Sequence, residues 1–102
     1  MMINQISERV IGCAFAVSNG LGVGFLEKFY ENALAHEIRK AGLSVVQQHL
    51  VDSTVLVESK HVRGVEDVHL AQCLNHLKAT GLRLCLLLNF GKPRVEIRRI
   101  SL

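Results

Sequence analysis

Glu58 and Lys60 are the two residues whose types and spacing most directly suggest chemistry in this chain of 102 residues. They follow Val57 at the end of an apolar segment, and residues two apart on a β-strand project from the same face. A carboxylate there can hold Mg²⁺, and a neighbouring ammonium can polarise an attacking water or a scissile phosphate. A Glu-x-Lys pair on a strand is more often a solvated ion pair. The position of the pair in the fold therefore decides between a catalytic pair and a solvated one.

Two further polar residues could support such a site from helices. Glu27 falls in the first turn of a helix predicted from about Phe25 to Lys40, where it is either a metal or water ligand or a simple complement to the helix dipole. Gln72 and His76 are four apart on another predicted helix and share a face. A helical amide can orient a water or a phosphate oxygen, although Gln and His are also commonplace on helix surfaces.

The cysteines and histidines predict no zinc site from spacing. His69 and Cys73 are spaced as one pair of zinc ligands, but no second pair completes the four that a structural site requires. The cysteines are three in number, far apart in the sequence, and form no Cys-x-x-Cys pair. They therefore predict free thiols in a reducing compartment.

The composition is that expected of one globular domain, residues 1–102. Apolar residues make up 49% and charged residues 21%, as in ordinary soluble proteins. The net charge of +3 permits contact with a polyanion such as DNA or RNA, but the basic residues are scattered. The N-terminus has no basic segment typical of a signal peptide, and the longest apolar run, Leu84 to Leu88, is far too short to span a bilayer. We expect a cytoplasmic protein with no membrane partner.

Hydrophobic periodicity predicts an α/β fold with a small mixed β-sheet flanked by helices. The expected elements are helices at about 3–17, 25–40 and 66–80, strands at 43–47 and 82–90, a short hairpin turning at Asp52-Ser53, and a last strand that contains Val95 and Ile97.

Four segments taken together carry a more specific signal. They are Gly24-x-x-Glu27-x-x-Tyr30, Val57-Glu58-Ser59-Lys60, His69-x-Ala71-Gln72-x-x-Asn75-His76-Leu77-Lys78-Ala79-Thr80-Gly81 and Leu87-Leu88-Asn89-Phe90-Gly91-Lys92-Pro93. In this order, and over nearly the whole chain, they resemble the GxxExxY proteins, a family placed in the PD-(D/E)xK nuclease superfamily. The resemblance implies a restriction-endonuclease-like core and Mg²⁺-dependent hydrolysis of phosphodiester bonds.

The same resemblance assigns roles to individual residues. Glu58 and Lys60 match the E-x-K element, Gln72 matches the helical glutamine, and these three are the implied catalytic residues. Glu27 matches the family's helical glutamate and, with Glu58, is an implied metal ligand. His76 stands where the family usually has tyrosine, and Ser59 replaces a usual leucine.

The chain departs from the family between His49 and Leu50. Family members continue there through a further strand or hairpin that ends in an Ala-Asp-Leu-Leu-Val-like segment, whose aspartate is the first metal ligand. Here the hairpin and its aspartate are missing, and if the register is kept without a gap, Gln48 occupies the aspartate's place. Asp52 is a poor replacement, because six strand residues before Glu58 correspond to about 20 Å.

We therefore expect a truncated nuclease-like domain that binds Mg²⁺ weakly and has little or no activity. Two alternatives stay open. A non-catalytic nucleic-acid-binding module would use basic residues on phosphates. A protein-interaction module would form a homo-oligomer, since loss of a hairpin exposes an unpaired sheet edge. The candidate phosphate contacts are Lys60, Lys92, Arg94, Arg98 and Arg99.

Overall fold

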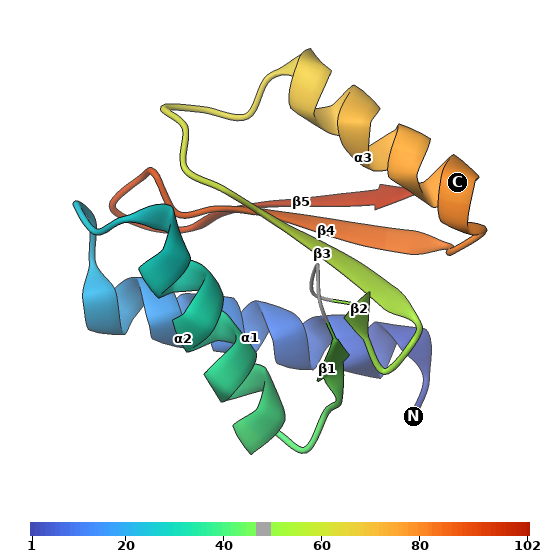
Figure 1. Ribbon diagram of the computed structural model, residues 1–102, viewed down its shortest axis with the longest axis horizontal. Coiled ribbons are helices and arrows are strands. Elements are labelled where there is room, and N and C mark those ends of the chain that lie inside the picture. The colour runs from blue at the N-terminus through green and yellow to red at the C-terminus, as the bar shows by residue number, and fades with distance from the viewer. Residues whose placement is uncertain (47–49) are drawn as a thin grey trace.

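The computed structural model describes residues 1–46 and 50–102, and these form three helices and five strands (Figure 1). The order confirms the predicted α/β class with a small mixed sheet. Residues 47–49 lie outside the described residues. They include Gln48, which would take the place of the family's aspartate if the sequences are aligned without a gap. The elements are α1 (Ile3–Leu21), α2 (Glu27–Lys40), β1 (Val45–Val46), β2 (Leu50–Val51), β3 (Val55–Lys60), α3 (Asp67–Thr80), β4 (Leu84–Asn89) and β5 (Glu96–Ser101).

The strands lie in the order β1-β2-β3-β4-β5, and β3 and β4 are parallel while the other pairs are antiparallel. Helix α3 is the crossover that a parallel pair requires. β3 pairs with β4 along its whole length, from Val55 to Lys60, but with β2 only at Val55 and Leu56. Among the described strands, the segment from Val57 to Lys60 is therefore paired on one side only.

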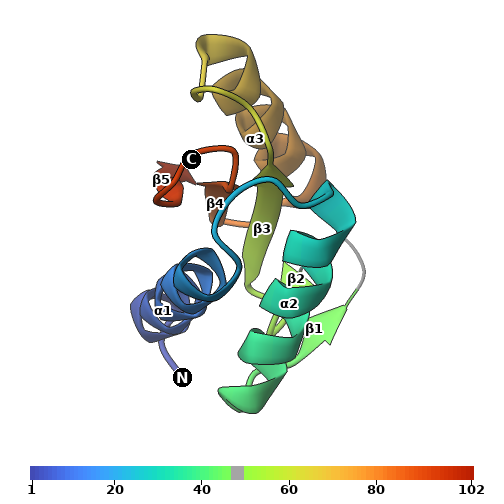
Figure 2. The same cartoon turned by 90° about the vertical axis from the view of Figure 1, so that its left-hand side faces the viewer.

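Helices cover both faces of the sheet: α1 and α2 lie on one side and α3 on the other (Figure 2). Every residue of β4 is buried, as is typical of a central strand covered on both faces, and the strand was predicted at 82–90 from its apolar run. The side chains of β3 and β4 alternate between two apolar clusters, and the smaller cluster lies under α3. That cluster consists of Leu56, Cys73, Leu77, Cys85 and Leu87.

Several element ends differ from the sequence expectation. Helix α1 continues to Leu21, where the N–H of Gly22 (φ 70°) donates to Ser18 O and ends the helix. The strand expected at 43–47 is reduced to Val45–Val46 in the described residues, because Leu43 lies in the turn that follows α2 and donates its N–H back to Ile38 O. Helix α3 ends at Thr80, as predicted, and the following Gly81 adopts the left-handed conformation.

The chain leaving β3 is held to the end of β4 by Asn89, which is fully buried. Its Oδ1 accepts the N–H of Val62 (3.0 Å) and of Gly91 (2.9 Å), and its Nδ2 donates to Val62 O (2.9 Å) and to Glu96 Oε1 (3.1 Å). The Asn89 amide is the largest cause of a lowered pKa at Glu96. These bonds fix the end of the strand that carries Glu58 and Lys60.

No helix in the described ranges 1–46 and 50–102 is long and apolar enough to cross a membrane.

Candidate functional site

A pocket of about 670 Å³ lies beside the half-paired strand β3, between α2, β1 and α3. Glu58 and Lys60 line it from β3, and Gln72 and His76 line it from α3. The strand alternation turns Glu58 and Lys60 to the α3 face, and the i, i+4 spacing presents Gln72 and His76 to them. The structure thus brings together the three residues predicted to be catalytic.

Glu27 is placed differently. It is the exposed first residue of α2, and it is not among the described residues that line the pocket. The helix lines the pocket through a stripe that starts at Lys28 and includes Glu31, one turn after Glu27. A polar stripe of period three to four along α2 was the signal that could have identified Glu31.

Both carboxylate oxygens of Glu58 are engaged by side chains of α3. The Sγ–H of Cys73 donates to Oε2 at 2.9 Å, and the Nδ1–H of His76 donates to Oε1. The Glu58 side chain is only 14% exposed. The carboxylate that was predicted to bind a metal is therefore hydrogen-bonded to a thiol and an imidazole.

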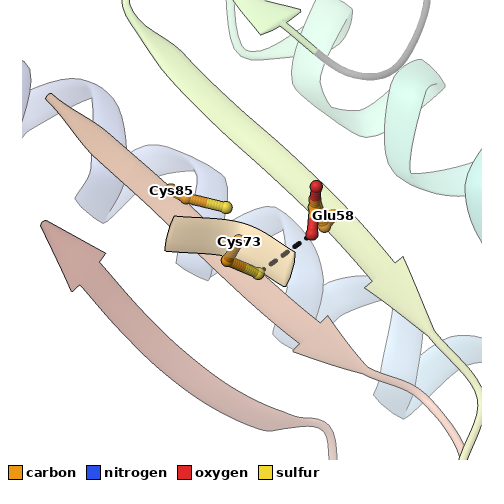
Figure 3. Close-up of side chains that lie close together, drawn as sticks. All are labelled: Glu58, Cys73 and Cys85. Carbon is orange, nitrogen blue, oxygen red and sulfur yellow. Dashed lines mark hydrogen bonds between the residues drawn. The ribbon is translucent and has the colours of Figure 1, made fainter. Parts of the chain in front are cut away.

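Cys85 on β4 completes a compact group with Glu58 and Cys73, shown in Figure 3. The donor atoms of these three residues all lie within 4.8 Å of one another. The sequence reasoning missed this group, because Cys73 and Cys85 lie on different elements and meet only when α3 packs on the sheet. The three cysteines are free, as predicted.

The hydrogen bond with Cys85, burial and the hydrogen bond to Glu58 all raise the pKa of the Cys73 thiol, in that order of size. Cys73 is therefore a neutral hydrogen-bond donor at neutral pH and not a nucleophile. His69, which its spacing pairs with Cys73, serves elsewhere: its Nδ1 accepts the N–H of Glu66 (2.9 Å) at the start of α3.

Asp52 lies in the turn between β2 and β3, at the end of β3 away from Glu58. Its Oδ1 accepts the N–H (2.7 Å) and the Oγ–H (3.0 Å) of Ser44. Mg²⁺ prefers oxygen ligands in an octahedral arrangement, whereas the groups nearest Glu58 are two thiols and an imidazole. This donor set fits Mg²⁺ poorly.

The basic residues predicted to contact phosphates are distributed over both faces of the sheet. On β5, Arg98 pairs with Glu96 at 3.0 Å, while its neighbour Arg99 donates to Asn4 of α1 at 2.7 Å on the opposite face. Lys60 lines the pocket. A single continuous basic surface is therefore not formed by these residues in the described structure.

The mixed sheet with helices on both faces and a Glu-x-Lys pair at a pocket defines an α/β fold consistent with a restriction-endonuclease-like core. The chain matches the family described as the PD-(D/E)XK nuclease superfamily in two segments, residues 4–52 and 49–100. Because these segments together cover nearly the whole sequence, the chain belongs to the PD-(D/E)XK nuclease superfamily. Neither the curated proteins nor the solved structures compared with the chain gave a significant match.

Proposed function

We propose that this protein is a GxxExxY-type member of the superfamily that has lost Mg²⁺-dependent phosphodiester hydrolysis through an internal deletion. The observation that carries the proposal is the environment of Glu58, whose two carboxylate oxygens are both hydrogen-bonded to side chains of α3, to Cys73 and to His76. Two observations support a deletion. The family match divides at residues 49–52, and β3 has a described partner from β2 at only two positions.

The residues that remain suit phosphate binding better than phosphate cleavage. Lys60 supplies a positive charge in the pocket, and Gln72 supplies an amide that can donate to a phosphate oxygen. In-line displacement needs concentrated positive charge on the developing pentavalent centre, which a bound cation with two acidic ligands normally supplies. With Glu58 as the only expected ligand that reaches the described pocket, Mg²⁺ affinity and transition-state stabilisation are both reduced.

The first prediction concerns nuclease activity. Purified protein incubated with single- and double-stranded DNA and with RNA, in Mg²⁺ or Mn²⁺, is expected to cleave no faster than the variant Glu58→Ala. Gel electrophoresis of labelled substrates measures cleavage. Robust cleavage by the unaltered protein that disappears in Glu58→Ala would overturn the proposal.

The segment of β3 from Val57 to Lys60, which the described strands pair on one side only, favours a second candidate function, a homodimer formed through the sheet. Unpaired strand edges pair readily with other chains unless charges or bulges protect them. At the opposite edge, β5 carries the exposed charges of Arg98 and Arg99. Beside the half-paired segment of β3, Val46 of β1 leaves 57% of its surface exposed.

We predict a dimer at micromolar concentration, measured by light scattering, that Val46→Lys weakens because it places a charge at the edge. Val68→Lys is the matched control: Val68 is similarly exposed (55%) but lies on α3 and does not line the pocket. A monomeric unaltered protein, or equal weakening by both variants, contradicts the dimer.

A further inference from the structure

Four side chains with metal-binding atoms gather around Glu58, which lines the pocket together with His76. Glu58, Cys73 and Cys85 hold their donor atoms within 4.8 Å of one another, and His76 Nδ1 is hydrogen-bonded to Glu58. Figure 3 shows both thiols and the carboxylate pointing toward one another from three different elements. Cys73 and His76 are three apart on α3, so both project from the helix face that packs over β3.

The setting of this group resembles a metal site in three physical respects. Both thiols are fully buried, so they are shielded from solvent and oriented by packing. The carboxylate and the imidazole line the pocket, which gives an ion a route from solvent. The group joins strand to helix to strand, and the apolar residues Leu56, Leu77 and Leu87 surround it.

We propose that Glu58, Cys73, Cys85 and His76 bind Zn²⁺, in place of the Mg²⁺ that the superfamily leads one to expect. Two thiolates, an imidazole and a carboxylate are ligands that Zn²⁺ takes, and four of them complete a tetrahedral site. At zinc–ligand distances of about 2.0–2.3 Å, neighbouring donors of such a site are roughly 3.5 Å apart. Glu58, Cys73 and Cys85 are already close to this spacing, and His76, which is hydrogen-bonded to Glu58, turns toward them to complete the site.

Binding follows a simple proton balance. The ion replaces the protons on both thiols, and these pass through the pocket to solvent, while His76 binds as a neutral imidazole whose remaining proton is carried on Nε2. Zinc affinity therefore rises with pH. No oxidant or reductant takes part, and the ion keeps its charge.

A site closed by four protein ligands is structural, because no coordination position is left for water or substrate. It would fasten α3 to β3 and β4, and it would remove Glu58 from phosphate chemistry altogether. The inference goes beyond the proposed loss of nuclease activity and does not depend on it, because its test measures metal binding and not cleavage.

The test uses the full chain, stripped of metal and kept under reducing conditions. Equilibrium dialysis is expected to show one Zn²⁺ bound per chain at micromolar protein, undiminished by millimolar Mg²⁺. Co²⁺ serves as a spectroscopic substitute, and ligation through sulfur is expected to produce an intense thiolate-to-cobalt charge-transfer band. Absence of stoichiometric zinc, or a cobalt complex without that band, overturns the proposal.

Three cysteine variants locate the site. Cys73→Ser and Cys85→Ser are each expected to weaken zinc binding by at least about 100-fold, since even residues that only support ligands commonly matter by 10- to 100-fold. Cys13→Ser is the matched control, because Cys13 is also a buried free thiol but lies on α1 in the other apolar cluster. Equal loss in Cys13→Ser and Cys73→Ser contradicts the site.

Circular dichroism establishes that each variant folds. If a serine variant does not fold, the zinc affinity of Glu58→Gln is measured instead. Glutamine keeps the size of the glutamate side chain, which lines the pocket, so this variant is expected to fold. It is expected to lower zinc affinity while leaving the thiolate-to-cobalt band in place. Unchanged zinc affinity in Glu58→Gln would show that the Glu58 carboxylate is not a zinc ligand, and it would overturn the proposed set of four ligands.

Discussion

Replacing Gly91 by alanine is expected to lower the free energy of unfolding by about 3 kcal/mol. A Cβ added at this position would lie 2.3 Å from Val62 O and 2.6 Å from Val62 N. These are backbone atoms, so they cannot rotate away as a side chain would. The strand end and the loop after β3 must separate to make room. For a chain of this size, such a loss corresponds to a fall in Tm of more than about 10 °C.

Urea unfolding followed by circular dichroism measures the change. Gly64→Ala is the control, because no described atom lies within 4 Å of a Cβ built there and its backbone has no positive φ. We expect Gly64→Ala to change stability by less than about 0.5 kcal/mol. If the two variants unfold at the same urea concentration, the close approach of Gly91 to Val62 is not present in solution.

Replacing Asn89 by alanine is expected to cost a similar amount, about 3 kcal/mol, for a different reason. The side chain makes four hydrogen bonds, two of them to the backbone of Val62 and one to the N–H of Gly91. Each net bond is worth about 1 kcal/mol, and buried partners left unpaired add to the cost. The substitution also removes the donor that most lowers the pKa of Glu96.

Chemical unfolding again provides the measurement, with Asn75→Ala as the control because Asn75 is exposed on α3. A loss below about 1 kcal/mol for Asn89→Ala contradicts the buried network. The double variant with Gly91→Ala is expected to lose less than the sum of the two single losses. Both substitutions release the same Val62 backbone, and contacts that share a partner are not additive.

These two positions matter to the site because they determine where β3 ends. Phe90 donates its N–H to Lys60 O at 2.9 Å, so the last residue of the Glu-x-Lys pair is bonded to the same loop. The segment that contains Asn89 and Gly91 therefore anchors the strand that carries Glu58 and Lys60.

Local patterns in the sequence were sufficient for much of the fold. Periodicity of three to four located three helices, and the continuous apolar run before Asn89 identified the strand that is covered on both faces. The alternation along β3 placed Glu58 and Lys60 on one face, and the spacing of Gln72 and His76 placed them opposite. These features depend on residues within one element, so the sequence contains the information directly.

Contacts between elements could not be read in this way. The meeting of Cys73 with Cys85 depends on how α3 packs across two strands, and no spacing rule links a helix residue to a later strand. The pocket is lined by Lys28 and Glu31 of α2 and not by the exposed Glu27. Side chains distant in sequence come within bonding distance only after the apolar clusters have set the distances between layers, so packing, and not local pattern, determined what surrounds Glu58.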